Sequence, residues 1–163
     1  MNIIDTVYEE LKKSGFKIST AESCTSGYIS NLLTSKSGSS AFFEGGIVVY
    51  SNDTKINVLG VDSNLIDLYT EVSEQVALDM AIKSKEMMNT DIAIATTGYA
   101  DVDGYGTEEN PPGTIFIAIS TPWGNEVKKL KLKESRSRNT YLACLESLEM
   151  LLKNLKIHQA LEL

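Results

Sequence analysis

The sequence predicts an α/β protein, a three-layer α/β/α domain in which a mixed β-sheet lies between two layers of helices. Segments with helical periodicity alternate with short apolar, β-branched runs over most of the chain. Two such runs then follow each other around a Pro-Trp-Gly-Asn turn, which indicates an antiparallel hairpin. The 163 residues contain no repeat, linker or low-complexity segment. We therefore expect one domain over residues 1–163, with a parallel core and a C-terminal hairpin.

The first 50 residues predict two helices and two strands. Residues 2–14 carry apolar side chains at helical spacing, and Gly15 follows as a helix stop. Residues 16–21 form a short apolar run that predicts a strand. A helix is expected over residues 25–35, beginning inside a cluster of small hydroxyl and thiol side chains. Residues 45–50 are mostly apolar and β-branched, which is typical of a strand buried on both faces.

Three helices are expected in the middle of the chain. The first spans residues 54–59, behind the capping residues Ser51-Asn52-Asp53, and Gly60 ends it. A short helix is expected over residues 63–69, and Ser73 caps a long one. Each has the capping side chain or the glycine that a helix end requires, so we expect all three to form.

The last part of the chain predicts the rest of the sheet and a closing helix. Residues 91–97 form an apolar strand, and a long glycine-rich, acidic loop follows over residues 98–113. Residues 114–119 and 126–132 form the two strands of the hairpin. A helix with leucines on its inner face spans residues 137–153, and we expect the residues after 154 to form a frayed tail.

Charge and composition limit the classes of partner. The net charge of −7 argues against a general nucleic-acid binder, which needs a basic face, but allows a small anionic ligand held by a few local cations. No apolar run approaches the ~20 residues of a membrane span, and the N-terminus lacks the pattern of a signal peptide. We expect a cytoplasmic protein in which Cys24 and Cys144 are reduced thiols outside any zinc motif.

The segment from Thr20 to Gly27 is the first candidate site. It holds five small hydroxyl or thiol side chains between a predicted strand and a predicted helix. A helix start offers unpaired N–H groups and a positive dipole end, which suit a nucleophile or a phosphate. The only histidine is His158, in the C-terminal tail. A serine or cysteine nucleophile here must therefore use a lysine or a tyrosine as its base, or no side-chain base at all.

Two more loops are expected beside this segment. In open α/β sheets, ligands bind beyond the carboxyl ends of the parallel strands, where loops 20–27, 50–55 and 97–113 begin. If those strands are neighbours, the loops bring a nucleophile, two candidate bases and further hydrogen-bonding groups into one cleft. The side chains expected there are Ser23, Tyr50, Asn52, Lys55 and Thr97.

Several separated blocks of the chain also match one known family in the right order. Residues 20–27 read Thr-Ala-Glu-Ser-Cys-Thr-Ser-Gly, against a TAESCTGG signature. Residues 38–46, with Val49-Tyr50-Ser51-Asn52 and Lys55, match a GSSAxFxGG…YSNxxK block. A TGIAGPxGGTEExPVGT loop is matched in part by Thr97-Gly98, Gly106-Thr107-Glu108-Glu109 and Pro112-Gly113-Thr114. From Thr20 to the last helix, the chain resembles the CinA C-terminal domain family, which includes the nicotinamide-nucleotide amidohydrolase PncC.

The resemblance implies a compact α/β/α domain that hydrolyses the carboxamide of nicotinamide mononucleotide to nicotinic acid mononucleotide and ammonia, without a metal or a cofactor. By position, it implies that Ser23 is the nucleophile, that Lys55 and Tyr50 activate it, and that Arg136 meets the substrate phosphate. Thr97, with amides of its loop, would hold substrate or the oxyanion. The whole set of substrate-binding residues implied in this way is Thr25, Gly27, Asn52, Thr97, Gly98 and Arg136.

The sequence departs from the family pattern in the loop over residues 99–105, which lacks the Gly-Pro pair and adds Asp101 and Asp103. Thr140 stands where a second arginine is common. These departures favour an alternative, a catalytically weak or inactive CinA-like domain that binds a nucleotide or a partner protein. Two more alternatives stay open: Cys24 as the nucleophile, and Ser23 as a helix cap only. Apolar faces on the first and last helices would permit a homodimer or higher homo-oligomer.

Overall fold

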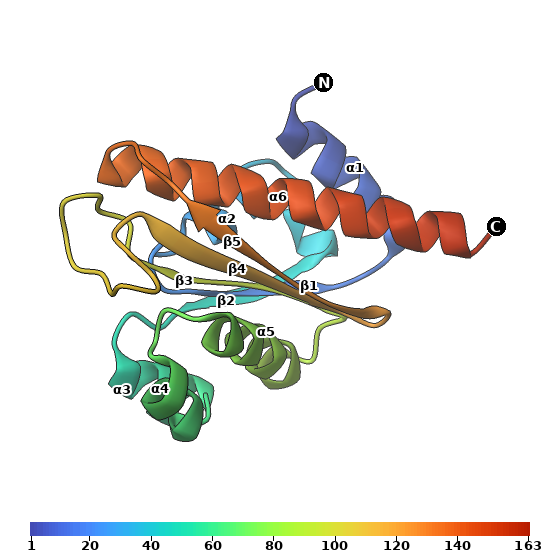
Figure 1. Ribbon diagram of the computed structural model, residues 1–163. Helices are drawn as coiled ribbons and strands as arrows, with labels where there is room; N and C mark the ends of the chain where they lie inside the picture. The colour runs from blue at the N-terminus through green and yellow to red at the C-terminus, as the bar shows by residue number, and fades with distance from the viewer.

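A five-stranded mixed sheet forms the middle layer of the computed structural model, which describes residues 1–163 (Figure 1). The strand order is β2-β1-β3-β4-β5. The strands are β1 (Ile18–Glu22), β2 (Phe43–Val48), β3 (Ile92–Gly98), β4 (Thr114–Thr121) and β5 (Gly124–Lys131). Strand β1 is parallel to β2 and β3, whereas β4 is antiparallel to both β3 and β5. The predicted parallel core and C-terminal hairpin are therefore confirmed.

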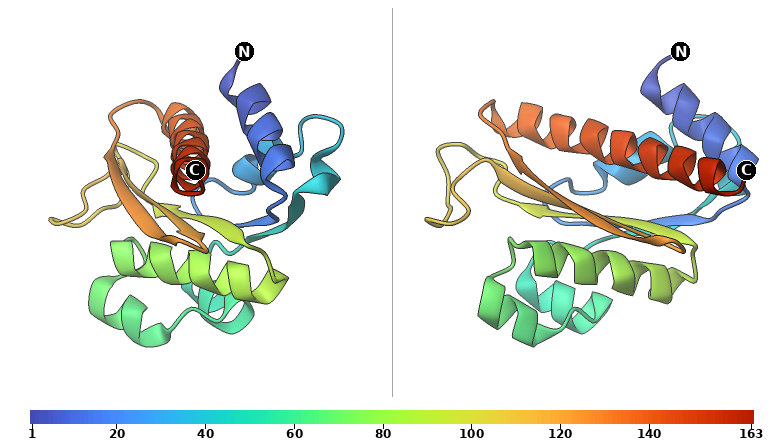
Figure 2. Two further views of the ribbon diagram at one scale, coloured as in Figure 1. Left: turned by 90° about the vertical axis from the view of Figure 1, so that its right-hand side faces the viewer. Right: turned by 45° about the vertical axis from the view of Figure 1, so that its right-hand side comes forward.

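Helices cover both faces of this sheet, as Figure 2 shows in two further views. One layer contains α1 (Ile3–Ser14), α2 (Tyr28–Leu33) and α6 (Arg136–Leu161). The other contains α3 (Asn52–Thr54), a π-helical turn over Lys55–Leu59, α4 (Ser63–Tyr69) and α5 (Glu74–Met88). A single 3₁₀ turn, Ser39–Ala41, precedes β2. The three-layer α/β/α arrangement agrees with the sequence prediction.

The helix ends in the middle of the chain form as their capping residues predict. Ser51 and Ser73 accept hydrogen bonds from the backbone amides of Thr54 and Val76, respectively. Gly60 ends the π-helical turn in the left-handed conformation, with φ of 87°, which glycine adopts without steric cost.

The central strands divide their side chains between two apolar clusters. Ile94 of β3 belongs to the cluster under α1 and α6, where Leu148 is buried. Ala95, the next residue, belongs to the cluster under α5, where Met80 is buried. Successive side chains of a strand point to opposite faces, and the small alanines let α5 lie close to the sheet. Burial on both faces fixes the carboxyl ends of β1 and β3 as a rigid support for the loops that follow them.

The prediction that residues 45–50 are buried on both faces is wrong. Strand β2 lies at the edge of the sheet, and its residues alternate between half-buried and exposed, with Val48 exposed. An apolar run does not reveal whether a strand has one neighbour or two. Gly46 lets β2 lie close to β1 and α2, because a Cβ at this position would lie only 2.3 Å from the hydroxyls of Ser30 and Thr20.

Two predicted helix limits also differ from the structure. Helix α2 begins at Tyr28 instead of residue 25, because residues 24–27 form a turn with Gly27 as N-cap. Helix α6 continues to Leu161, so the expected frayed tail is helical. Leu155 is buried in the core cluster, and His158 stacks on Trp123 with ring centroids 4.3 Å apart. These contacts stabilise the end of α6 and hold the only histidine on Trp123, which is not among the residues of the candidate site described below.

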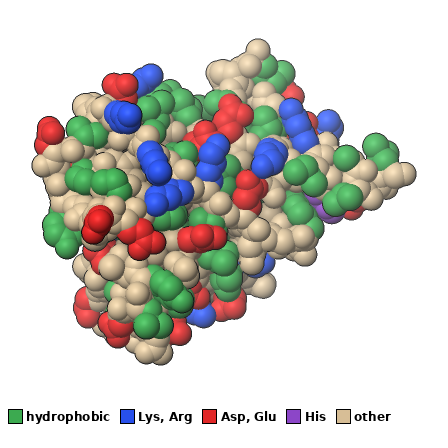
Figure 3. All heavy atoms as spheres, viewed as in Figure 1, with side chains coloured by type: hydrophobic (Ala, Val, Ile, Leu, Met, Phe, Trp, Pro, Cys, Tyr) green, Lys and Arg blue, Asp and Glu red, His purple; other side chains and the backbone are tan.

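The strand at one edge of the sheet, β5, carries several exposed lysines. Lys128, Lys129 and Lys131 are exposed on β5, and lysines gather on this face of the molecule in Figure 3. Such lysines discourage edge-to-edge association of strands. None of the helices has the length and the apolar character required to cross a bilayer.

Candidate active site

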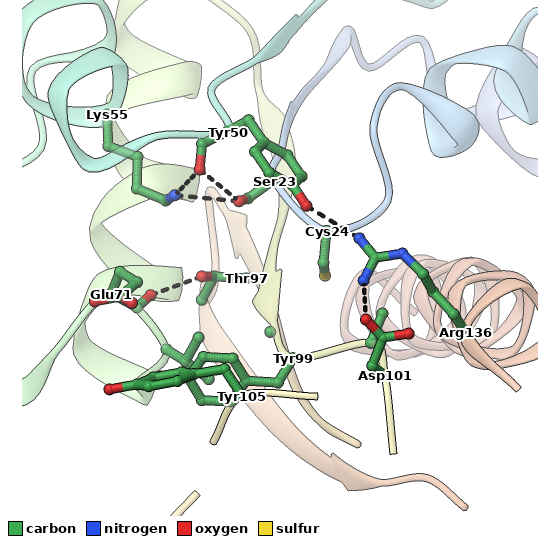
Figure 4. Close-up of a pocket in the computed structure, with 13 residues that line it drawn as sticks. Ser23, Cys24, Tyr50, Lys55, Glu71, Thr97, Tyr99, Asp101, Tyr105 and Arg136 are labelled. Carbon is green, nitrogen blue, oxygen red and sulfur yellow. Dashed lines mark hydrogen bonds and ion pairs between the residues drawn. The ribbon is translucent and has the colours of Figure 1, made fainter. Parts of the chain in front are cut away.

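The loops after β1, β2 and β3 converge at the carboxyl edge of the sheet, as predicted. They line a cavity of about 200 Å³, shown in Figure 4. Ser23 comes from the first loop, Tyr50 and Lys55 from the second, and Thr97 from the end of β3. Arg136, the first residue of α6, reaches the same cavity from the opposite helical layer. Four of the five side chains expected in this cleft, and the predicted arginine, therefore line one space.

Ser23 and Lys55 form the central pair of the cavity. Lys55 Nζ lies 3.1 Å from Ser23 Oγ and donates a second hydrogen bond to the Tyr50 carbonyl oxygen at 2.9 Å. The Lys55 side chain is only 1% exposed, and no carboxylate lies within ion-pair distance of its ammonium. Lys55 begins the π-helical turn, and such turns are frequent at functional sites.

Burial changes the proton affinity of this lysine. Desolvation lowers the pKa of Lys55 below its ordinary value of 10.5, and the Glu71 carboxylate opposes that shift only in part. A lysine with a lowered pKa is neutral more often near physiological pH, and its lone pair can then accept the proton of Ser23. The pair can therefore generate a serine nucleophile without histidine.

The start of α2 does not offer its amides to a ligand, contrary to the prediction. Glu22, which is fully buried, accepts hydrogen bonds from the amides of Ile29 and Ser30 at 2.8 and 3.0 Å. Its carboxylate therefore occupies the positive end of the helix. Two other donors remain beside the nucleophile, since the amides of Cys24 and Thr25 donate no hydrogen bond within the chain. Of these two residues only Cys24 lines the Ser23 cavity, so its amide is the candidate donor to an oxyanion.

Three of the predicted binding residues lie outside the Ser23 cavity. The Thr25 hydroxyl is buried between Glu22 and Thr96, at 2.7 Å from each. Gly27 caps α2 and, with Thr25, lines a neighbouring cavity of about 760 Å³. Asn52 is exposed at the start of α3 and lines neither cavity. Asn52 therefore lies in the helical turn directly before Lys55 and not in the cleft.

Thr97 and Gly98 line the cavity, but both make contacts that hold neighbouring elements together. The Thr97 hydroxyl donates to the Glu71 carbonyl oxygen at 2.6 Å, so its proton is not free for a substrate. At Gly98 a Cβ would lie 2.7 Å from the Ile115 Cα, so only glycine lets β4 approach here. Both residues shape the wall of the cavity, and the Thr97 oxygen can only accept a further hydrogen bond.

The Tyr50 hydroxyl does not contact Ser23. It accepts a hydrogen bond from the Arg136 guanidinium at 3.0 Å, and the side chain is largely exposed. Tyr50 approaches Ser23 through its backbone carbonyl oxygen instead, at 3.5 Å. A strand-end position in the sequence could not distinguish these two atoms. The structure places the Tyr50 backbone beside Ser23 and Lys55, and the phenol that was predicted to activate Ser23 lies on Arg136 instead. The other terminal nitrogen of Arg136 lies 2.6 Å from the carboxylate of Asp101.

The cavity also contains side chains that were not predicted as part of the site, among them two tyrosines and a glutamate. Tyr99 and Tyr105 form an aromatic pair with centroids 5.6 Å apart and rings inclined at 69°. Burial raises the pKa of the Tyr99 phenol, which therefore stays neutral. Glu71, between α4 and α5, adds a carboxylate near Lys55. The two tyrosines lie in the loop over residues 97–113, which was expected to lie beside the site, so the sequence contained some indication of them. Nothing in the sequence singled out Glu71.

Cys24 lines the cavity beside Ser23 but is a poor nucleophile. Burial raises the pKa of its thiol to about 12, so almost no thiolate exists at neutral pH. Burial also raises the pKa of Cys144, in the core under α6. We expect neither thiol to react with a thiol-specific reagent at pH 8 in the folded protein, and both to react after unfolding in urea. Rapid labelling of Cys24 in the folded protein, located by mass spectrometry, would show that the turn after Ser23 opens.

The fold and the site together define an α/β/α domain with a histidine-free serine–lysine pair at the carboxyl edge of its parallel strands. No group of three or more His, Cys, Asp or Glu side chains is placed to hold a metal ion. The chain belongs to the CinA family, because the family model "CinA C-terminal domain" matches residues 1–155.

Known proteins agree with this membership. A CinA-like protein of Shewanella denitrificans is 40% identical over 146 residues, which are 89% of this chain and 34% of that protein. The chain spans about a third of the length of the curated relatives it matches. The crystal structure of the competence damage-inducible protein A (ComA) from Klebsiella pneumoniae has a TM-score of 0.90 at 28% identity, covering 94% of this chain and 95% of that chain. An Agrobacterium tumefaciens competence/damage inducible protein has a TM-score of 0.86 at 32% identity, covering 93% and 94%.

Proposed function

We propose that this domain is an amidohydrolase that converts nicotinamide mononucleotide to nicotinic acid mononucleotide and ammonia. The observation that carries the proposal is the 3.1 Å contact between Ser23 Oγ and the buried amine of Lys55. An amide carbon is attacked only by an activated nucleophile, and a desolvated lysine can supply that activation. The reaction needs no cofactor, and the proposed partner is a small-molecule nucleotide.

The residues of the cavity allow a balanced reaction. Ser23 Oγ attacks the carboxamide carbon as its proton passes to neutral Lys55, and the amide of Cys24, which has no partner within the chain, stabilises the resulting oxyanion. The carbon–nitrogen bond then breaks as Lys55 returns the proton to the leaving nitrogen, which releases ammonia. A water molecule, deprotonated by Lys55, next attacks the Ser23 ester. The bond between Ser23 Oγ and the acyl carbon breaks as Lys55 passes the proton taken from water to Ser23 Oγ, so the acid product leaves and the hydroxyl is restored.

The rest of the cavity suits the other parts of the substrate. The nicotinamide ring of the mononucleotide is a cationic pyridinium, and the faces of Tyr99 and Tyr105 can bind a cation. The Glu71 carboxylate adds negative charge on the same side. Arg136 is the only arginine of the cavity, and its planar guanidinium can bind a phosphate through two nitrogens. Arg138, the other arginine of the chain, lies over the Tyr141 ring instead.

The test is ammonia release from nicotinamide mononucleotide, with Ser23→Ala as the matched control. We expect release by the wild-type protein and none above background by Ser23→Ala, because alanine removes only the nucleophilic oxygen. No release by either protein would refute the proposed activity on this substrate. Equal release by both would show that Ser23 is not the nucleophile.

One observation favours a second candidate function, a nucleotide-binding domain without turnover. The guanidinium that would bind the phosphate is held by Asp101 and by the Tyr50 hydroxyl. Under this alternative, calorimetry would detect binding of nicotinamide mononucleotide to both the wild-type protein and Ser23→Ala. Neither protein would release ammonia, so the same two proteins separate the candidates.

A further inference from the structure

Arg136 has an internal carboxylate as its partner in the candidate site. Its Nη1 atom lies 2.6 Å from Asp101 Oδ2, and its Nη2 atom donates to the Tyr50 hydroxyl at 3.0 Å. Both terminal nitrogens of the guanidinium are therefore engaged, as Figure 4 shows. Asp101 reaches Arg136 from the loop between β3 and β4.

This ion pair can exchange with a ligand. The Arg136 and Asp101 side chains are 51% and 46% exposed, so water screens their attraction and either can be displaced at small cost. The contact is nevertheless a specific hydrogen bond, at 2.6 Å, and it raises the pKa of Arg136 above its usual value. A phosphate that binds the guanidinium through both terminal nitrogens approaches the same two nitrogens that Asp101 and Tyr50 now contact, so it competes with the Asp101 carboxylate for the positive charge.

Asp101 affects a phosphate ligand in a second way. A carboxylate displaced from Arg136 by a phosphate stays close to that phosphate, because Asp101 and Arg136 line the same cavity. Like charges held that close repel each other even in water. A nucleoside that carries the cationic pyridinium but no phosphate meets no such repulsion. The same carboxylate therefore opposes the mononucleotide and tolerates the nucleoside.

We propose that Asp101 is a specificity-determining residue, an internal competitor for Arg136 that shifts the preference of this site away from phosphomonoesters and toward ligands with less negative charge. The inference rests on the proposed function only in taking a pyridine nucleotide as the ligand. It predicts that this domain distinguishes less between nicotinamide mononucleotide and nicotinamide riboside than it does when Asp101 is neutral.

The experiment compares Asp101→Asn with Asp103→Asn, which removes the same charge from an exposed, unpaired position of the same loop. Each substitution is made in the Ser23→Ala background, so that the ligands are not turned over, and calorimetry measures Kd for nicotinamide mononucleotide and nicotinamide riboside. We expect Asp101→Asn to tighten binding of the mononucleotide by about tenfold and to leave the riboside unchanged or weaker. Asp103→Asn should change either Kd by less than about twofold, because its charge is screened.

A titration with inorganic phosphate distinguishes a failure of this inference from a failure of the proposed function. If no variant binds either pyridine compound, the proposed function fails. The inference about Asp101 is then tested by titrating inorganic phosphate into proteins in which Ser23 is intact. Tighter phosphate binding by Asp101→Asn than by Asp103→Asn supports it. Equal effects of the two substitutions on the mononucleotide and on phosphate overturn it. Asp101→Ser provides a second neutral variant, and melting temperatures verify that each protein is folded.

Discussion

Replacing Lys55 by methionine is expected to lower the turnover of nicotinamide mononucleotide by about 10²- to 10⁴-fold, the usual contribution of a general base. Lys55 Nζ is the basic atom nearest to Ser23 Oγ, at 3.1 Å, and methionine fills similar space without a lone pair that can take a proton. In the wild-type protein, kcat/KM should rise with pH as Lys55 loses its proton, and burial moves this limb below pH 10.5 by lowering the pKa of the amine.

The same substitution should not unfold the protein, because the buried ammonium is itself costly. Below the lowered pKa of Lys55, the folded protein must hold a charged amine in a site that is 1% exposed, and the full cost of desolvation is present. As pH rises through that pKa, the folded state loses its proton before the unfolded chain does, which happens near 10.5. The wild-type protein is thus stabilised by rising pH in this window, and the stability advantage of Lys55→Met should shrink there.

Ammonia release measures the loss of turnover, and urea denaturation at several pH values measures how the stability difference changes with pH. Lys131→Met is the matched control, since Lys131 is exposed at the end of β5. It should leave both turnover and the pH dependence of stability near those of the wild-type protein. Retained turnover in Lys55→Met would show that another group takes the proton of Ser23. A stability difference that grows with pH would contradict the buried, desolvated state of this lysine.

The placement of the site could be predicted because it depends on topology. Three loops start where parallel strands end, and neighbouring parallel strands end at one edge of a sheet, so Ser23, Lys55 and Thr97 had to approach each other once β1, β2 and β3 were adjacent. Helix limits could be predicted where a side chain or a glycine makes the cap itself, as at Ser51 and Ser73.

The partners of individual atoms could not be predicted, because contacts between distant parts of the chain decide them. The Tyr50 hydroxyl lies on Arg136, 86 residues further along, and its carbonyl oxygen meets Lys55. The helix continues over residues 155–161 because Leu155 reaches a core built from other elements of the chain. In the same way, the amides at the start of α2 are taken by Glu22, a residue that the sequence presents only as part of the family signature.

Glu22 is the second position at which a single change should have a large effect. Its Oε1 atom accepts from the Thr25 hydroxyl and the Ile29 amide, at 2.7 and 2.8 Å, and its Oε2 atom accepts from the Ser30 amide and hydroxyl, at 3.0 and 2.7 Å. We expect Glu22→Gln to lower the free energy of unfolding by about 3 kcal/mol. Whichever oxygen the amide group replaces, an N–H donor then faces a buried backbone N–H of α2, and that donor loses its acceptor.

Chemical denaturation measures this loss, with Glu44→Gln as control, because Glu44 is exposed on β2 and has no ion-pair partner. The control should stay within about 0.5 kcal/mol of the wild-type protein. Glu22 also holds the turn that carries Ser23, through Thr25 and the first amides of α2. Glu22→Gln should therefore reduce ammonia release at temperatures where it is still folded. A Glu22→Gln protein as stable as the control would mean that water satisfies these donors, and that the turn does not depend on the buried carboxylate.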